Sequence, residues 1–194
     1  VLLCRQAEQS KTSCIIPSGR SFDLPDFFIG ETRLFFKSRV WYNQSIKLNL
    51  RGSIMKFDIN QLTWTREPAA YTISEEKIEI ITKPHTDLWQ RTYYHFRNDN
   101  APVLQMETEE AFFSFTVKTE FESSHRFDQC GIVMYLDSAN WLKGSIEFEN
   151  DRFQHLGSVV TNNGYSDWAT TEIIAAIKCM WYRFSRREDD YCIE

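Results

Sequence analysis

The stretch AFFSFTVKTEF, residues 111–121, decides the fold class. Its apolar residues alternate with polar ones, so that Phe113, Val117 and Phe121 lie on one side of an extended chain, together with Phe115 and Thr119. A period of two is the pattern of a β-strand with one buried face. We therefore predict a strand over residues 111–121 that faces a hydrophobic core.

The same kind of signal recurs on both sides of this stretch. Residues 131–136 form a nearly continuous apolar run, which predicts a strand covered on both faces. Turn residues separate further strand-like runs at residues 70–73, 77–82, 88–96, 141–150, 153–161 and 178–185. Only residues 171–177 are expected to form a helical turn or two. Evenly spaced short strands predict an all-β sandwich or barrel.

Charge divides the chain of 194 residues into two parts. Residues 1–54 contain eight Lys/Arg and four Asp/Glu, whereas residues 55–194 contain fourteen and twenty-three, a net charge of −9. The strand rhythm begins at Met55. We predict a β-sandwich domain over residues 55–194, preceded by an N-terminal extension, residues 1–54, whose order the sequence does not determine. An acidic domain repels phosphate backbones, so nucleic acid is not an expected partner.

The cysteines and the hydropathy pattern argue against several classes of site. The five cysteines contain no CxxC pair, and the four histidines show no ligand spacing, so we expect free thiols, no metal site and no cofactor. Free thiols indicate a reducing compartment. The chain has no apolar run of about 20 residues, the length of a membrane helix, so no membrane partner is expected.

Polar and aromatic side chains in two stretches could bind a ligand. In an extended segment over residues 88–96, Gln90 and Tyr94 face one side and Arg91 the other, and their amide, ring and guanidinium groups can hydrogen-bond to a sugar or stack on it. Asp128 and Gln129 lie where a loop meets the apolar strand, a common position for binding groups. The structural alternatives are a cross-strand ladder at Arg91 and an Asx-type turn at Asp128.

Two more stretches add candidates. Lys143 and Glu147 share one strand face with Glu149, and Glu147 and Glu149 would stand about 7 Å apart at a rise of ~3.3 Å per residue. That separation is near the range of glycosidase carboxylate pairs, but an exposed polar face explains it more simply. Asp167 and Trp168 lie in a predicted loop, residues 161–168, where the indole could stack on a sugar or cap the core.

Several of these motifs together resemble the regulation of enolase protein 1 family. The matching runs are residues 86–94, 128–131, 140–143, 158–161 and 166–168, within a match of about residues 62–194. The resemblance implies a concanavalin A-like jelly roll of two antiparallel sheets, in a largely uncharacterised family with no established catalytic set. It also implies a cytoplasmic protein linked to regulation of the glycolytic enzyme enolase.

The chain departs from the family pattern in two places. The family usually has glycine where this chain has His95, and we expect the bulkier side chain to narrow any groove there. Family members also continue for several strands beyond the position of Glu194, so we expect the last strands of the jelly roll to be missing.

Three functions follow from the sequence. The first is a non-catalytic module for a carbohydrate or sugar-like ligand, with a groove lined by Gln90, Arg91, Tyr94, Asp128, Gln129, Lys143, Glu147, Asp167 and Trp168. The second is a cytoplasmic regulatory protein that acts through a protein partner such as enolase and presents an exposed apolar patch. The third is a glycoside hydrolase that uses Glu147 with Glu149 or Asp128. We expect binding rather than catalysis.

Overall fold

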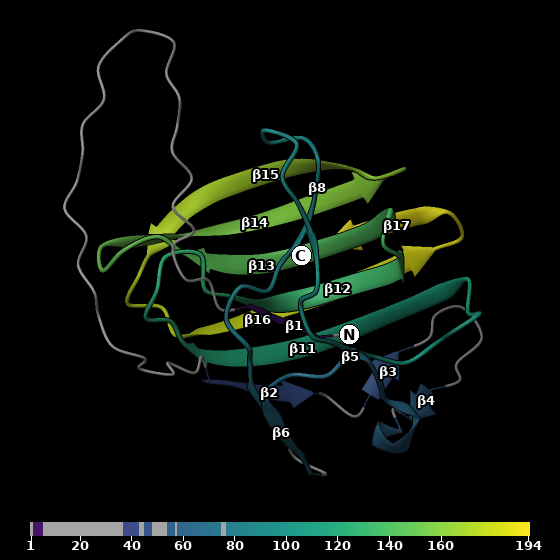
Figure 1. Ribbon diagram of the computed structural model, residues 1–194. Coiled ribbons are helices and arrows are strands. Elements are labelled where there is room, and N and C mark those ends of the chain that lie inside the picture. Colours follow the sequence, from purple (N-terminus) through teal and green to yellow (C-terminus); the bar gives the residue numbers. More distant parts are fainter. Residues whose placement is uncertain (1, 6–36, 43–44, 48–53, 57, 75–76) are drawn as a thin grey trace, which may run out of the picture.

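Figure 1 shows the computed structural model of the chain, which describes residues 2–5, 37–42, 45–47, 54–56, 58–74 and 77–194. A short 3-10 helix, η1, covers Ile59–Gln61. The strands are β1 (Leu2–Arg5), β2 (Lys37–Tyr42), β3 (Ser45–Lys47), β4 (Ile54–Lys56), β5 (Thr63–Arg66), β6 (Ala70–Ile73), β7 (Lys77–Ile81), β8 (Leu88–Gln90), β9 (Arg97–Asp99), β10 (Val103–Gln105), β11 (Phe112–Glu122), β12 (Gln129–Asp137), β13 (Asn140–Phe148), β14 (Phe153–Asn162), β15 (Tyr165–Ile174), β16 (Cys179–Arg187) and β17 (Asp190–Ile193).

Most of the strands form two antiparallel sheets. The front sheet has the order β15-β14-β13-β12-β1-β10-β5, and the back sheet has the order β17-β16-β11-β2-β7-β6. In Figure 1 the front sheet faces the viewer, and the hairpin β8–β9 crosses in front of it. The predicted all-β sandwich of two antiparallel sheets is confirmed.

The main core lies between the inner faces of the two sheets. Val117 and Phe121 of β11 are buried there against Ile132 and Ile146 of the front sheet. Both residues belong to the alternating set that predicted this strand, because side chains two residues apart on a strand point to the same face.

A second, smaller cluster covers the outer face of the front sheet. Leu88 packs there with Val133, Trp141 and Val159, and Ala101 and Val103 complete the cluster. The segment of residues 86–101 therefore lies over the outer face of the sheet, and we call it the covering segment. It explains why β12 is apolar on both faces, as predicted for a strand covered on both sides.

Strands on the N-terminal side of residue 55 also pair within the sheets. β1 lies between β10 and β12, and β2 lies between β11 and β7. Residues 6–36 and three shorter stretches of the predicted extension lie outside the described residues. The domain boundary at residue 55 therefore stays a prediction, while β1 is a member of the front sheet and β2 a member of the back sheet.

The structure corrects the predicted strand over residues 88–96. β8 ends at Gln90, and the chain returns as β9 over Arg97–Asp99, beyond the end of the predicted strand. Arg91, Tyr94 and His95 have φ values of 63°, 47° and 57°. These left-handed conformations reverse the chain, although residues with a β-carbon seldom adopt them.

The predicted helical turn over residues 171–177 and the predicted loop over residues 161–168 are also wrong in part. Tyr165–Ile174 is one strand, β15, and Thr171 pairs with Leu156 of β14. Only Asn163 and Gly164 separate β14 from β15. Pairing along ten residues of β14 outweighs the weak local preference for a turn, and the threonines of this stretch favour a strand.

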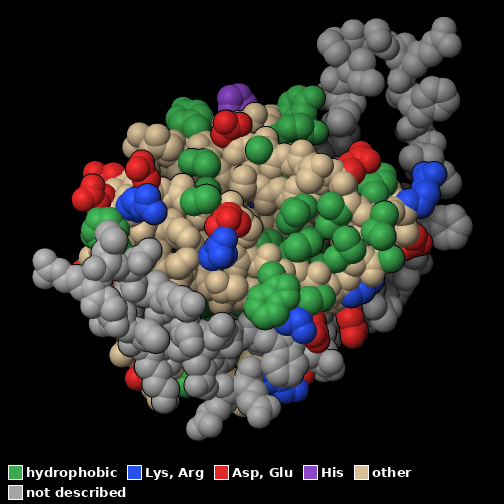
Figure 2. Space-filling view, turned by 180° about the vertical axis from the view of Figure 1, so that it is seen from behind, with side chains coloured by type: hydrophobic (Ala, Val, Ile, Leu, Met, Phe, Trp, Pro, Cys, Tyr) green, Lys and Arg blue, Asp and Glu red, His purple; other side chains and the backbone are tan. Residues whose placement is uncertain are grey.

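Hydrophobic side chains also gather on the back of the molecule, as Figure 2 shows. Among the exposed apolar residues of the strands are Val160 of β14 and Trp181 of β16. Within the described residues, no helix is long and apolar enough to cross a membrane.

The closest backbone approach in the front sheet is at Gly131 of β12. A β-carbon there would overlap the carbonyl oxygen of Gly144 in β13 and lie 2.7 Å from the Cα atom of Ser145. We expect Gly131→Ala to lower the free energy of unfolding by about 3 kcal/mol, measured by urea denaturation, because rigid backbone must move.

The matched control for this variant is Gly144→Ala. A β-carbon at Gly144 would meet the Cγ2 atom of Ile193 at 2.9 Å, and this side chain can rotate away. We expect a smaller loss of stability than for Gly131→Ala. Equal losses in the two variants would contradict the proposed backbone clash.

Candidate functional site

Lys143 joins the covering segment to the front sheet. Its side chain is 4% exposed, and its Nζ atom donates to the carbonyl oxygen of Leu88 at 3.0 Å and to Oε1 of Gln129 at 3.1 Å. The same Nζ atom lies 3.7 Å from Oδ1 of Asp87. A buried ammonium is stable only when carboxylate and carbonyl oxygens surround it in this way.

Gln129 connects this hydrogen-bond network to Glu147 on the outer face of the sheet. Its Nε2 atom donates to Oε2 of Glu147 at 2.5 Å, and its Oε1 atom accepts from Ser145 at 3.4 Å. Gln129 and Glu147 are direct cross-strand neighbours in β12 and β13. Gln129 therefore orients the Glu147 carboxylate, which is half-buried.

Gln90 anchors the start of the hairpin turn. The residue is 1% exposed, its backbone N–H donates to Oγ of Ser166 at 2.9 Å, and its Nε2 atom donates to the carbonyl oxygen of Ser138 at 2.7 Å. Ser138 lies in the β12–β13 turn, where Asn140 and the Ala139 N–H bond to the carboxylate of Asp137 and hold its pKa below the usual range. Gln90 thus ties the covering segment to two hairpins of the front sheet.

Asp99 makes a further attachment on the other arm of the hairpin. Its carboxylate lies 3.2 Å from Nη2 of Arg66 and accepts hydrogen bonds from Tyr135 and Ser138. This ion pair joins β9 to β5, the edge strand of the front sheet. These residues are absent from the sequence-based site, because they lie 33 or more residues from Asp99 along the chain and form no local pattern.

Asp128 holds the loop that precedes β12. It is 0% exposed, and its Oδ2 atom accepts from the backbone N–H groups of Ser124 and His125, each at 2.9 Å. The carboxylate is therefore a loop-forming group, as in the structural alternative considered for it.

A second group of side chains surrounds Gly157 on the outer face of the front sheet. The register sets Gly157 opposite Thr170, Glu147 opposite His155, and His155 opposite Glu172. Trp168 is opposite Val159, two residues from Gly157. We call this set the outer patch; it consists of Glu147, His155, Gly157, Trp168, Thr170 and Glu172.

The indole of Trp168 lies over the space that Gly157 leaves. A β-carbon at Gly157 would be only 2.7 Å from the Nε1 atom of Trp168. The ring is 41% exposed and meets the imidazole of His155 edge to face, with centroids 5.7 Å apart. Glycine at this position lets the ring lie low on the sheet while part of it remains open to solvent.

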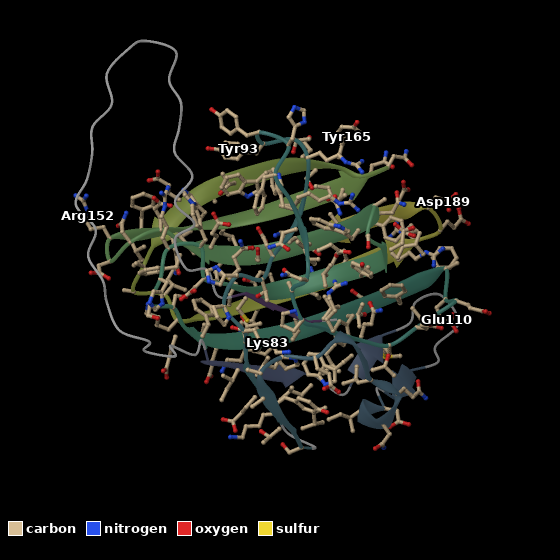
Figure 3. The ribbon with its side chains drawn as sticks, in the orientation of Figure 1. Lys83, Tyr93, Glu110, Arg152, Tyr165 and Asp189 are labelled. Atoms are coloured by element: carbon tan, nitrogen blue, oxygen red, sulfur yellow. The ribbon has the colours of Figure 1, made fainter. Side chains whose placement is uncertain are left out.

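The turn between β8 and β9 forms a separate surface at one end of the sandwich. Nη1 of Arg91 lies 3.4 Å from the carbonyl oxygen of Gly164, and the guanidinium stands 5.6 Å from the centroid of Tyr165. Tyr93 and Tyr94 are 63% and 80% exposed. Figure 3 shows Tyr93 and Tyr165 projecting from the same end of the molecule, far from Arg152.

The structure brings together some of the residues predicted to line a groove and separates the others. Gln129, Lys143 and Glu147 form one hydrogen-bonded series, and Trp168 shares the outer patch with Glu147. Gln90 is buried at the start of the β8–β9 turn, and Arg91 and Tyr94 lie in that turn. Asp128 lies in the loop before β12. Asp167 faces away from Trp168, because neighbouring residues on a strand point to opposite faces.

The sequence-based set contains two members of the outer patch, Glu147 and Trp168, and omits His155, Gly157, Thr170 and Glu172. For Glu172 the reason is the predicted helical turn over residues 171–177, which hides its position on the face of Trp168. The signal was present, since Trp168, Thr170 and Glu172 alternate along β15. In the described part of the chain, no three His, Cys, Asp or Glu side chains come close enough to hold a metal ion.

We expect Lys143→Met to lower the free energy of unfolding by roughly 3 kcal/mol, because Asp87 and Gln129 lose a buried cationic partner. Hydrogen exchange should accelerate at the covering segment, starting with Leu88. Lys118→Met is the control, because Lys118 pairs with Glu120 at a half-exposed position of the back sheet and should change stability less. Unaltered exchange at Leu88 in Lys143→Met would refute the anchoring role.

Comparisons with known proteins agree with this architecture. A family model described as "Protein of unknown function (DUF1349)" matches residues 64–194. The protein named "Regulation of enolase protein 1" from Saccharomyces cerevisiae (strain ATCC 204508 / S288c) is 34% identical over 128 residues, which are 65% of this chain and 62% of the yeast protein. The chain thus spans less than two thirds of the length of this relative.

A solved structure, "The crystal structure of a functionally unknown protein from Saccharomyces cerevisiae", matches with a TM-score of 0.63 and 28% identity and covers 71% of this chain and 72% of the solved one. The predicted resemblance to the regulation of enolase protein 1 family is therefore confirmed. Since the family model matches more than half of its length, the chain belongs to the DUF1349 family of proteins of unknown function.

Proposed function

We propose that the chain is a non-catalytic binding module that holds a carbohydrate or another polyhydroxylated ligand on the outer patch. The observation that carries this proposal is the indole of Trp168, 41% exposed beside Gly157, with Glu147, His155 and Glu172 on the same face. An aromatic ring set among hydrogen-bonding side chains matches the two kinds of surface on a sugar.

Each group of the outer patch would have a distinct part in binding. The Trp168 ring offers an apolar surface to the C–H face of a sugar, and the exposed hydroxyl of Thr170 can donate and accept hydrogen bonds. The carboxylates of Glu147 and Glu172 accept hydrogen bonds from sugar hydroxyls. Because Glu147 is held by Gln129, its orientation is set before the ligand arrives.

This proposal is narrower than the one drawn from the sequence. Lys143 and Gln129 are buried and hydrogen-bonded within the protein, so they stabilise the outer face without contacting a ligand. Gln90 is also buried and cannot contact a ligand. Direct ligand contact is therefore assigned to Glu147 and Trp168 from the original set, with His155, Thr170 and Glu172 added to it.

We expect Trp168→Ala to weaken binding to any glycan retained on an array by about tenfold, which corresponds to roughly 1.4 kcal/mol. Trp181→Ala is the control, because Trp181 is 58% exposed on the back sheet, away from the outer patch. Circular dichroism shows whether each variant is folded. A folded wild-type chain that binds no glycan on the array would contradict the proposal.

A second candidate function is regulation through a protein partner. The name of the yeast relative refers to regulation of enolase, and the structure adds a group of exposed rings in the β8–β9 turn, with Phe96 at 42% exposure beside Tyr93 and Tyr94. Exposed aromatic residues are enriched where proteins bind each other. A cytoplasmic location is part of this second proposal.

Purified enolase from the same organism tests the second function. We expect surface-immobilised chain to bind enolase with a micromolar or tighter Kd, and saturating chain to alter the rate of the enolase reaction. Bovine serum albumin is the control for non-specific adsorption. No binding, together with an unchanged rate, would count against enolase as the partner.

The glycoside hydrolase hypothesis receives less support from the geometry. Glu147 is bonded to Gln129, Glu149 pairs with Arg126 at 2.9 Å, and Asp128 is buried by its loop. The three carboxylates thus have separate partners. The outer patch supports binding more directly than it supports a paired acid and base.

A further inference from the structure

Two hairpins meet at one end of the sandwich and form a single surface there. The turn β8–β9 lies against the turn β14–β15, since the N–H of Gln90 donates to Ser166 and the guanidinium of Arg91 reaches both Gly164 and Tyr165. Tyr93 and Tyr165, one from each hairpin, both project into solvent at this end in Figure 3.

Four aromatic side chains are exposed on this surface, which we call the ring cluster. Tyr93 is 63% exposed, Tyr94 80%, Phe96 42% and Tyr165 61%. Tyr93 and Tyr94 contact each other edge to face, with centroids 4.6 Å apart. Aromatic rings gathered in this way are typical of the central part of a protein interface.

The backbone presents these rings in a fixed arrangement. The N–H of Arg91 donates to the carbonyl oxygen of Phe96 at 2.7 Å, and the N–H of Phe96 donates to that of Tyr93 at 2.8 Å. Tyr94 and His95 between them adopt left-handed conformations, with φ values of 47° and 57°. A glycine would be free of this strain, but it would not carry a side chain to the surface.

The β8–β9 turn carries basic side chains on an acidic domain. Arg91 and Arg97 lie within residues 91–97, which contain no carboxylate, whereas residues 55–194 have a net charge of −9. A local cationic site on an acidic protein attracts an acidic partner and repels further copies of the same cationic site.

We propose that the ring cluster, with Arg91 and Arg97 beside it, is a docking surface for an acidic face of a partner protein. The proposal rests on the second candidate function and gives it a location and a chemistry. The rings would enter an apolar hollow on the partner, and the guanidinium groups would pair with the carboxylates around it.

Two other occupants fit this surface less well. A second copy of the chain, joined through a two-fold axis, would place the Arg91 and Arg97 side chains of both copies against each other. An anionic membrane would attract the arginines, but it would also repel an acidic domain. A partner protein with an acidic face has neither conflict.

Photo-cross-linking in cells of the source organism tests the location. The full chain carries p-benzoylphenylalanine in place of Tyr94 or, as the control, in place of Tyr191, which is 46% exposed on β17. We expect a cross-link from position 94 that maps to an acidic surface of one identified protein, with none to that protein from position 191. No cross-link from position 94, or one to a neutral or basic surface, would overturn the proposal.

Affinity measurements with the purified cross-linked protein then test the chemistry. We expect Tyr93→Ala with Tyr94→Ala, and separately Arg97→Glu, to raise the Kd at least tenfold, and the wild-type affinity to fall with added salt. Tyr191→Ala and Arg152→Glu are the matched controls and should retain binding. Equal Kd values in test and control variants would overturn the proposal.

The outcomes separate this proposal from the enolase function. A cross-link to enolase supports both, and a cross-link to the acidic face of another protein supports the docking surface while the enolase function fails. If enolase binds the Tyr93→Ala/Tyr94→Ala variant with the wild-type affinity, the enolase function is retained. The proposal that the ring cluster is the docking surface is then refuted. Binding to phosphatidylserine vesicles that needs these tyrosines, without any protein cross-link, also overturns it.

Discussion

The buried ammonium group of Lys143 is the contact on which the arrangement of both candidate surfaces depends. It stands among the carboxylate of Asp87, the carbonyl oxygen of Leu88 and the amide oxygen of Gln129, so it holds the covering segment against the front sheet. An unpaired charge in this position would cost several kcal/mol, whereas the paired one is satisfied on each side. Leu88 can therefore bury its side chain over Val133 and Val159.

That attachment divides the outer face of the sheet into a covered region and a partly open region. Toward Trp141 the face is filled by the covering segment, and toward His155 it remains partly open as the outer patch. The same segment carries the turn that displays Tyr93 and Tyr94. The proposed ligand site and the proposed docking surface thus share one support, through Gln129 for the first and Gln90 for the second.

The local patterns predicted strands well and their ends less well. The alternation that marks β11 and the apolar run of β12 have the periods that pleated strands require. The stretch after Gln90 was misread, because it contains no glycine or proline and its reversal uses left-handed Arg91, Tyr94 and His95. A helical turn was predicted from Thr171 onward, although the pairing of Thr171 with Leu156 of β14 decides its conformation.

By itself the sequence determined the all-β class, the family, and the fact that Lys143 and Glu147 lie on one strand face, since these depend on residue types and a short period. Tertiary structure alone decided which of those polar groups reach solvent. The partner of Lys143 at Leu88 is 55 residues away along the chain, and only the folding of the covering segment onto the sheet brings them together. The covering segment therefore buries Lys143, which becomes a structural residue, and leaves Trp168 exposed. Distant segments of the chain decide which part of a sheet face is covered, and the alternation of residues along a strand does not.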